Sequence, residues 1–243
     1  MKVFFEQYFD LDVIRENFSF VVDAFWETVQ LALISAALAL VLGLVVALLR
    51  AAPGRGMAPV RVLAISYIDV MRGIPLLLVV LLISGSFPFL DFLPQWLRAP
   101  DMFGKPDIFW YGVLSIALTY GAYYAEVYRA GLEAVPYGQM EAARSLGMSH
   151  ARAMRHVIVP QAIRKVIPPM LNDFIALMKD TSLVGVIALV EVVKAGREIQ
   201  AETFNSSALT LGALMFIVVT IPLARLVDRL IARQQLAMRR AAP

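Results

Sequence analysis

The chain has 243 residues, a formal net charge of +3 and no cysteine, and 60% of its residues are hydrophobic. Soluble domains average about 45–50% apolar residues, so this composition indicates a membrane protein. The lack of Cys excludes disulfides, thiolate metal sites and Cys nucleophiles. With only two His residues in addition, we expect no metal site and no catalytic residues.

Five segments are long and apolar enough to cross a membrane, which takes roughly 20 residues in a helix. In chain order, the predicted spans are residues 28–49, 62–82, 108–125, 168–190 and 208–224. We therefore expect an all-α integral membrane protein with five transmembrane helices in a single domain, residues 1–243.

The distribution of Lys and Arg predicts the orientation, because these residues accumulate on the cytoplasmic side. Fourteen of them lie in residues 50–61, in residues 129–165 and in the tail after residue 224, against six on the other side. This predicts a periplasmic N-terminus and a cytoplasmic C-terminus. Residues 1–19 are acidic and lack the apolar run of a signal peptide, so we expect an external amphipathic segment there.

The external connection of residues 85–107 combines three prolines with several aromatic residues. This composition predicts an ordered loop packed at the membrane interface, and a substrate lid is the alternative. The loop's role stays open at this point.

Polar residues inside the predicted spans are costly, and they usually face protein or a water-filled cavity. In the second span, Asp69 and Arg72 are three residues apart and could form an ion pair. Gly73 and Pro75 follow them and could instead interrupt the helix and expose its backbone to a pathway. Glu126 and Arg129, at the end of the third span, have the same spacing and predict a structural pair.

Residues 131–160 form a polar segment between the third and fourth spans. Pro136 can open a helix, Gly147 can end it in the left-handed conformation, and Ser149 suits the N-cap of a second helix. We expect Pro160 to end that second helix and to start the next one. The segment is thus predicted to be two short helices joined by a glycine turn, and His150 and His156 are expected to be exposed or at an interface.

The composition of this segment favours a protein interface over an ordinary helical loop, although both readings fit the pattern. Ala142, Ala143 and Gly147 would let a partner backbone approach closely, and Glu141 and Arg144 would provide a charged rim.

The fourth span carries the richest polar cluster. Asp173 and Asp180 fall on nearly one stripe of the helix, and Lys179 lies on the adjacent stripe. Residues 179–182 fall near mid-depth, where a zwitterionic substrate would need polar partners. Interhelical hydrogen bonds at a dimer interface are the alternative. Glu191 follows the span and is expected to be a solvated helix end, or else a contact for a substrate ammonium group.

The candidate substrate path combines these polar side chains with the arginine of the second span. It consists of Arg72, Asp173, Lys179, Asp180, Thr181, Ser182 and Glu191.

Residues 141–160 read EAARSLGMSHARAMRHVIVP and resemble the EAA motif of bacterial ABC importer permeases. Val157 and Val159 stand where that motif has Ile and Leu, which keeps both positions apolar. Residues 72–76 (RGIPL), 124–139 and 172–184 resemble segments of the polar amino acid permeases of the histidine/glutamine/arginine type. Together these stretches cover most of residues 60–200.

The resemblance implies an ABC type I importer permease fold in the bacterial inner membrane, surrounded by membrane lipid. It implies two ABC ATPase subunits that bind ATP and Mg, a second permease copy or homologue, and a periplasmic amino acid binding protein. The residues implied to couple the chain to the ATPases are Glu141, Ala142, Ala143, Gly147 and Pro160.

The chain lacks a G-x-x-x-x-G-K-[ST] phosphate loop, so we expect ATP hydrolysis in a separate ATPase partner. We expect no cofactor, nucleic acid or enzymatic activity for the chain itself. The alternative function is an ion-coupled secondary transporter or channel, with Lys179 and Asp180 as ion sites. That alternative leaves residues 136–160 unexplained.

Overall fold

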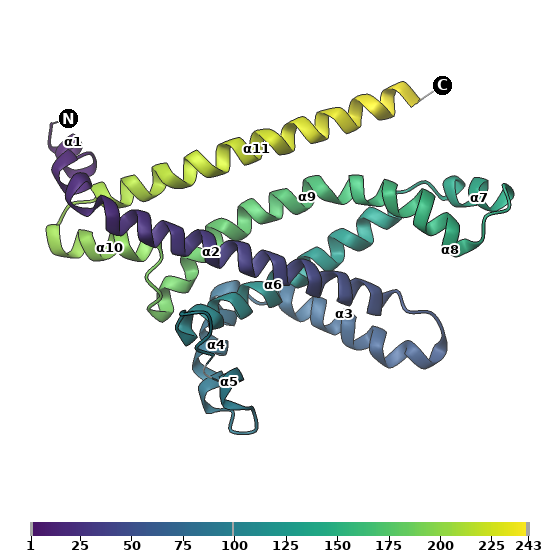
Figure 1. Ribbon diagram of the computed structural model, residues 1–243, viewed down its shortest axis with the longest axis horizontal. Coiled ribbons are helices and arrows are strands. Elements are labelled where there is room, and N and C mark those ends of the chain that lie inside the picture. The colour runs from purple at the N-terminus through teal and green to yellow at the C-terminus, as the bar shows by residue number, and fades with distance from the viewer. Residues whose placement is uncertain (1, 99, 242–243) are drawn as a thin grey trace.

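The computed structural model describes residues 2–98 and 100–241, which are helical almost throughout and contain no β-strand. The molecule is an elongated bundle in which α2 (Leu11–Arg50), α9 (Val159–Asp180) and α11 (Ser207–Ala241) run along its length (Figure 1). The two ends of the chain lie at opposite ends of the bundle (Figure 1). This arrangement fits the predicted opposite locations of the termini.

The bundle is built around the contact between α2 and α6 (Asp107–Glu133). A Cβ atom at Gly43 of α2 would lie 2.8 Å from the Tyr124 Cβ and 2.9 Å from the Gly121 carbonyl oxygen. Small residues of this kind let membrane helices approach backbone to backbone. A similar close contact joins α6 to α9, where a Cβ at Gly131 would overlap the Val166 side chain.

The main hydrophobic core lies where α2, α6, α9 and the neighbouring short helices meet. Its fully buried members include Leu31, Val80, Ile116, Leu177 and Val184.

The N-terminal helix α1 (Lys2–Tyr8) is fixed to the turn between α10 (Val192–Thr203) and α11 by hydrogen bonds. The Gln7 side chain donates to the Phe204 carbonyl, and the Asn205 side chain donates to the Glu6 carbonyl, both at 2.8 Å. The predicted external segment is therefore an ordered helix followed by the first turns of α2.

The second predicted span, residues 62–82, is divided into two helices. Helix α3 (Ala58–Gly73) and helix α4 (Leu76–Ser86) meet at an angle of 108°. A residue before proline is pushed towards extended backbone, and Ile74 has φ −96° and ψ 130°. Pro75 also lacks the N–H that would continue the hydrogen bonds of α3. The predicted alternative, an interruption at Gly73 and Pro75, is confirmed.

The fourth predicted span differs from the prediction at both ends. Helix α8 (His150–Ala153) continues through a π-helical turn at Met154–Ile158 directly into α9. Pro160 lies in the first turn of α9, so the expectation that it starts the next helix is confirmed. The expected break before it is wrong, because the π-helical turn joins α8 to α9 without a gap. At the other end, α9 stops at Asp180 and a 3-10 helix, η4 (Thr181–Ile187), completes the segment.

The connection between α4 and α6, described at residues 87–98 and 100–106, contains two short helices, η2 (Phe87–Phe89) and α5 (Gln95–Arg98). Within it, Arg98 pairs with Asp91 at 2.6 Å, and Lys105 pairs with Glu27 of α2. The prediction of an ordered loop is confirmed, and its role as a substrate lid stays a prediction.

By length and composition, two described helical stretches could cross a membrane, Val3–Arg50 and Ser207–Arg233. The bent pair of α3 and α4 makes a third if it counts as one span. Helices α6 and α9 lie at the positions of the third and fourth predicted spans, but they are not among the helices that are long and apolar enough by this criterion. The molecule is a multi-pass membrane protein, and the count of five spans stays a prediction.

Candidate functional site

A helical hairpin of α7 (Tyr137–Ser145) and α8 projects from one end of the bundle (Figure 1). Gly147 has φ +81°, so the predicted left-handed turn is confirmed. The Met148 N–H donates to the Ala143 carbonyl at 3.2 Å, and the Gly147 N–H donates to the Arg144 carbonyl at 3.0 Å. This bonding pattern is a Schellman motif, which satisfies the last carbonyls of α7.

The second helix of the hairpin starts as the sequence predicts. The Ser149 hydroxyl accepts a hydrogen bond from the Arg152 N–H at 3.3 Å, which makes Ser149 the N-cap of α8. Pro136 is also at a helix start, but it is the N-cap of α7 rather than its first helical residue. His150 and His156 are exposed, as expected.

The outer surface of the hairpin carries unburied apolar residues beside the polar ones. Leu146 is 82% exposed and Tyr137 is 77% exposed. Of the predicted coupling residues, Glu141, Ala142, Gly147 and Pro160 are exposed, whereas Ala143 is buried inside the hairpin.

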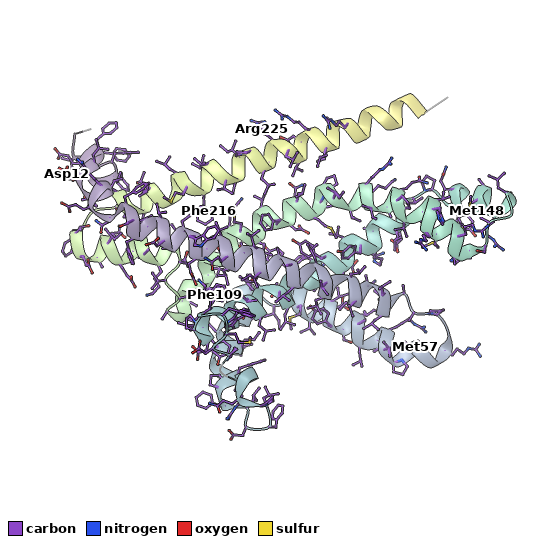
Figure 2. The ribbon with its side chains drawn as sticks, in the orientation of Figure 1. Asp12, Met57, Phe109, Met148, Phe216 and Arg225 are labelled. Atoms are coloured by element: carbon purple, nitrogen blue, oxygen red, sulfur yellow. The ribbon has the colours of Figure 1, made fainter. Side chains whose placement is uncertain are left out.

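The hairpin is attached to the rest of the protein by a small core of Val135, Ile158 and Ala162 with partly buried neighbours. It lies at the same end of the bundle as the α2–α3 turn. Figure 2 shows this through the labels Met148 and Met57.

A cavity of about 480 Å³ lies at the break between α3 and α4. It is lined by residues of three segments: the break itself, α6, and the second half of α9. The lining residues are Arg72, Gly73, Ile74, Pro75, Leu76, Thr119, Tyr120, Tyr123, Asp173, Ala176 and Asp180. Its volume is within the range of about 300–1,000 Å³ that small-molecule sites occupy.

The polar side chains of the cavity come from α6 and α9, together with Arg72 of α3. The Tyr120 hydroxyl donates to Asp180 Oδ2 at 2.8 Å, which fixes that carboxylate and leaves its second oxygen available. The Thr119 side chain is buried, and its Oγ1 has no hydrogen-bond partner among the described residues. A buried hydroxyl without a partner is uncommon in native proteins and indicates a group that a ligand or water satisfies.

The structure brings three of the predicted path residues together and separates the other four. Arg72, Asp173 and Asp180 share the cavity. Lys179 is exposed on another face of α9, so it lies outside the cavity.

The Thr181 and Ser182 hydroxyls donate to the carbonyls of Met178 and Lys179, at 2.7 and 2.8 Å. They therefore satisfy their own helix rather than the cavity. Glu191 is 1% exposed and caps α10 by accepting from the Val193 and Lys194 N–H groups, so the expectation of a solvated helix end is wrong.

Sequence reasoning missed the contribution of α6 to the cavity. Thr119, Tyr120 and Tyr123 recur at helical spacing in the third predicted span, and that pattern of hydroxyl groups on one face was a usable signal.

A cluster of charges lies beside the cavity around Glu126. Its carboxylate pairs with Arg129 at 2.8 Å and with Arg50, so the predicted Glu126–Arg129 pair is confirmed. Arg72 lies 4.0 Å from the same carboxylate and 5.5 Å from the centre of the Tyr123 ring. The predicted Asp69–Arg72 pair is absent, because Arg72 turns towards α6 while Asp69 is exposed.

We predict that Glu126→Gln destabilises the protein by about 1–3 kcal/mol, because it leaves several guanidinium groups around a neutral amide. Thermal unfolding of the purified protein measures the change. Glu133→Gln is the matched control, because Glu133 pairs only with Arg129 and is largely exposed, so its loss should be small. Equal effects of the two substitutions would contradict a central role for Glu126.

A bundle of apolar helices with a half-open cavity between them and a projecting helical hairpin is typical of a membrane transport protein. The chain belongs to the family described as "Binding-protein-dependent transport system inner membrane component", whose model matches residues 39–236.

Individual relatives agree with this assignment. The probable glutamine ABC transporter permease protein GlnM of Bacillus subtilis is 35% identical over 221 residues, covering 88% of this chain and 93% of the relative. The L-cystine transport system permease protein TcyB of the same organism is 33% identical over 195 residues, covering 80% and 77%.

A solved structure described as an amino acid ABC transporter with histidines superposes with a TM-score of 0.78 at 32% identity, covering 92% of this chain and 98% of that chain. The resemblance to permeases of polar amino acid ABC importers, drawn from residues 141–160 and their flanks, is confirmed.

Proposed function

We propose that this chain is the membrane permease subunit of an ATP-driven importer that moves polar amino acids inward by alternating access. The observation that carries the proposal is the α7–α8 hairpin, which projects from the bundle (Figure 1) and exposes Glu141, Ala142 and Gly147 together with Tyr137 and Leu146. The names of the relatives, for glutamine and L-cystine, support polar amino acids as the cargo.

In this proposal the N-terminus is periplasmic, the C-terminus is cytoplasmic, and five spans cross the inner membrane. Two ATPase subunits bind ATP and Mg, and each contacts one hairpin through the exposed residues Glu141, Ala142 and Gly147. A second copy of the chain or a homologous permease completes the pathway, and a periplasmic binding protein delivers the amino acid.

The path for the amino acid includes the cavity at the α3–α4 break. A broken helix presents backbone groups that no longer bond within the helix, and irregular backbone at membrane depth is tolerated only where it is buried in protein or lines a cavity. The cavity also holds three charged side chains, Arg72, Asp173 and Asp180, which membrane proteins keep for functional sites.

The test is reconstitution of the full chain in liposomes with the ATPase encoded beside it and the cognate binding protein. We expect the ATPase to co-purify with the chain. We expect uptake of a radiolabelled amino acid to require ATP on the side of the membrane where the ATPase lies. Uptake driven by an ion gradient without any ATPase would establish the alternative, a secondary transporter or channel.

A further inference from the structure

A second cavity, of about 330 Å³, lies where three segments of the bundle meet. These segments are the N-terminal part of α2, the start of α6 and the link between η4 and α10. The lining residues are Phe20, Asp23, Ala24, Glu27, Pro106, Ile108, Ala188, Leu189 and Val190. None of them lines the cavity at the α3–α4 break, so the second cavity is a separate site.

The second cavity lies at the level of one membrane surface. Glu27 comes directly before the first predicted span, Ile108 starts the third, and Val190 ends the fourth. Because the ends of three spans meet there, the cavity lies at the boundary between lipid headgroups and acyl chains. Trp26 is 60% exposed beside Glu27, and Trp is enriched at this depth in membrane proteins. In the orientation of the proposed function, this is the external surface.

The wall of the second cavity is mostly apolar and opens at its edge. Residues 20, 23, 24 and 27 follow the spacing i, i+3, i+4, i+7, so they share one face of α2. Ile108 and Leu189 add apolar side chains from the other two segments. Phe20 is 42% exposed and Val190 is 37% exposed, so the apolar wall continues to the outside of the bundle. An apolar wall that opens at this depth suits an acyl chain.

The two carboxylates of the second cavity differ in their partners. Glu27 pairs with Lys105, and the Lys105 Nζ also lies 5.2 Å from the centre of the Phe109 ring. Asp23 lies one helical turn before Glu27 and is exposed, and no described residue bonds or pairs with its carboxylate. The cavity therefore leaves one negative charge for a ligand to balance. Beside it, an ammonium group with three N–H donors gives one of them to Glu27.

We propose that the second cavity binds a phospholipid with a primary ammonium headgroup, such as phosphatidylethanolamine. Asp23 accepts hydrogen bonds from the lipid ammonium group, the remaining donors of Lys105 bind the phosphate, and the apolar wall holds the start of an acyl chain. A choline headgroup carries the same charge but has no N–H to donate to Asp23. The inference goes beyond the proposed function and takes from it only the positions of the membrane spans.

The test measures lipid binding to the full chain in complex with its ATPase by native mass spectrometry. Phosphatidylethanolamine and phosphatidylcholine with identical acyl chains are each titrated into the delipidated complex. The two lipids have the same net charge, so the basic cytoplasmic residues contribute little to the difference between them. We expect phosphatidylethanolamine to bind about threefold or more tightly, a modest ratio because Asp23 is exposed and its charge is partly screened.

Asp23→Asn locates the effect, because it removes the charge with almost no change of shape. The affinity for phosphatidylethanolamine should fall about threefold, to that of phosphatidylcholine, whose own affinity should stay unchanged. Asp12→Asn is the matched control, since Asp12 is exposed on the same helix outside the cavity and should leave the preference intact.

Photo-crosslinking gives the position of the lipid. A phosphatidylethanolamine with a diazirine at the start of one acyl chain is added to the complex, and the crosslinked peptides are identified by mass spectrometry. We expect crosslinks at residues 20–27, 106–108 or 188–190, the three parts of the cavity wall.

Equal binding of the two lipids by the unchanged complex would overturn the proposal, as would equal effects of Asp23→Asn and Asp12→Asn or crosslinks confined to other parts of the chain. Weaker docking of the binding protein to Asp23→Asn, with no change in lipid preference, would overturn it in favour of a protein occupant. Each variant is first checked for its unfolding temperature and for co-elution with the ATPase, which separates a lost lipid contact from a misfolded protein. The uptake assay tests the proposed function independently of all these outcomes.

Discussion

Replacing Gly147 by valine is expected to reduce ATP-dependent uptake about tenfold or more. Gly147 has φ +81°, a region that a β-branched residue enters only at a cost of about 1–3 kcal/mol. The substitution would open the Schellman turn and change the angle between α7 and α8, so the hairpin would no longer fit an ATPase surface. Uptake and ATPase co-purification in the reconstituted complex measure the loss.

Gly138→Val is the matched control for this experiment. Gly138 belongs to the same hairpin and, like Gly147, has nothing within 4 Å of an added Cβ, but its φ is not in the left-handed region. The control should therefore keep most of the uptake. If both variants lose uptake equally, added bulk on the hairpin is responsible, and the backbone conformation at Gly147 is not.

Replacing Gly43 by leucine is expected to destabilise the protein strongly by forcing α2 and α6 apart. The added side chain would meet the Tyr124 Cβ and the backbone of Gly121, and backbone atoms cannot turn away as the end of a flexible side chain can. Overpacking a tight core costs about 1–3 kcal/mol, and displacing two main-chain segments should reach the upper end of that range. The yield and unfolding temperature of the purified protein measure the effect.

Gly85→Leu tests whether this effect is specific to the α2–α6 contact. Gly85 also lies in an apolar helix, α4, but it is exposed and nothing lies within 4 Å of an added Cβ. We expect this variant to fold with an unfolding temperature close to that of the unchanged protein. A stable Gly43→Leu protein would show that α2 and α6 can separate without loss of the fold.

The local signals in the sequence predicted the hairpin well because each acts within a few residues. The positive φ of Gly147 and the N-cap at Ser149 depend only on glycine's conformational freedom and on a nearby hydroxyl. Pro160 shows the limit of such signals. A proline breaks a helix only if the helix cannot adjust, and here a π turn at Met154–Ile158 carries the helix through.

The long-range features of the site were less predictable. Hydropathy treats residues 62–82 as one apolar run, and it carries no information on the direction that α4 takes after Pro75. The pairing of Asp69 with Arg72 followed from helical spacing, but Glu126 on another helix attracts Arg72 instead. The burial of Glu191 depends on the N–H groups of α10, whose start the sequence did not mark.

Because the helix is continuous from His150 to Asp180, a movement of the hairpin at one end can move the cavity wall at the other end. The close contact of Gly131 with Val166 lies near the middle of this helix, so the helix can pivot there. At about 1.5 Å per residue, the arm to His150 is about 24 Å long and the arm to Asp180 about 21 Å. A tilt of about 5° around that point would thus move both ends by about 2 Å in opposite directions. A push on the hairpin would therefore move the Asp180 carboxylate to the extent that the helix stays straight through Pro168 and Pro169.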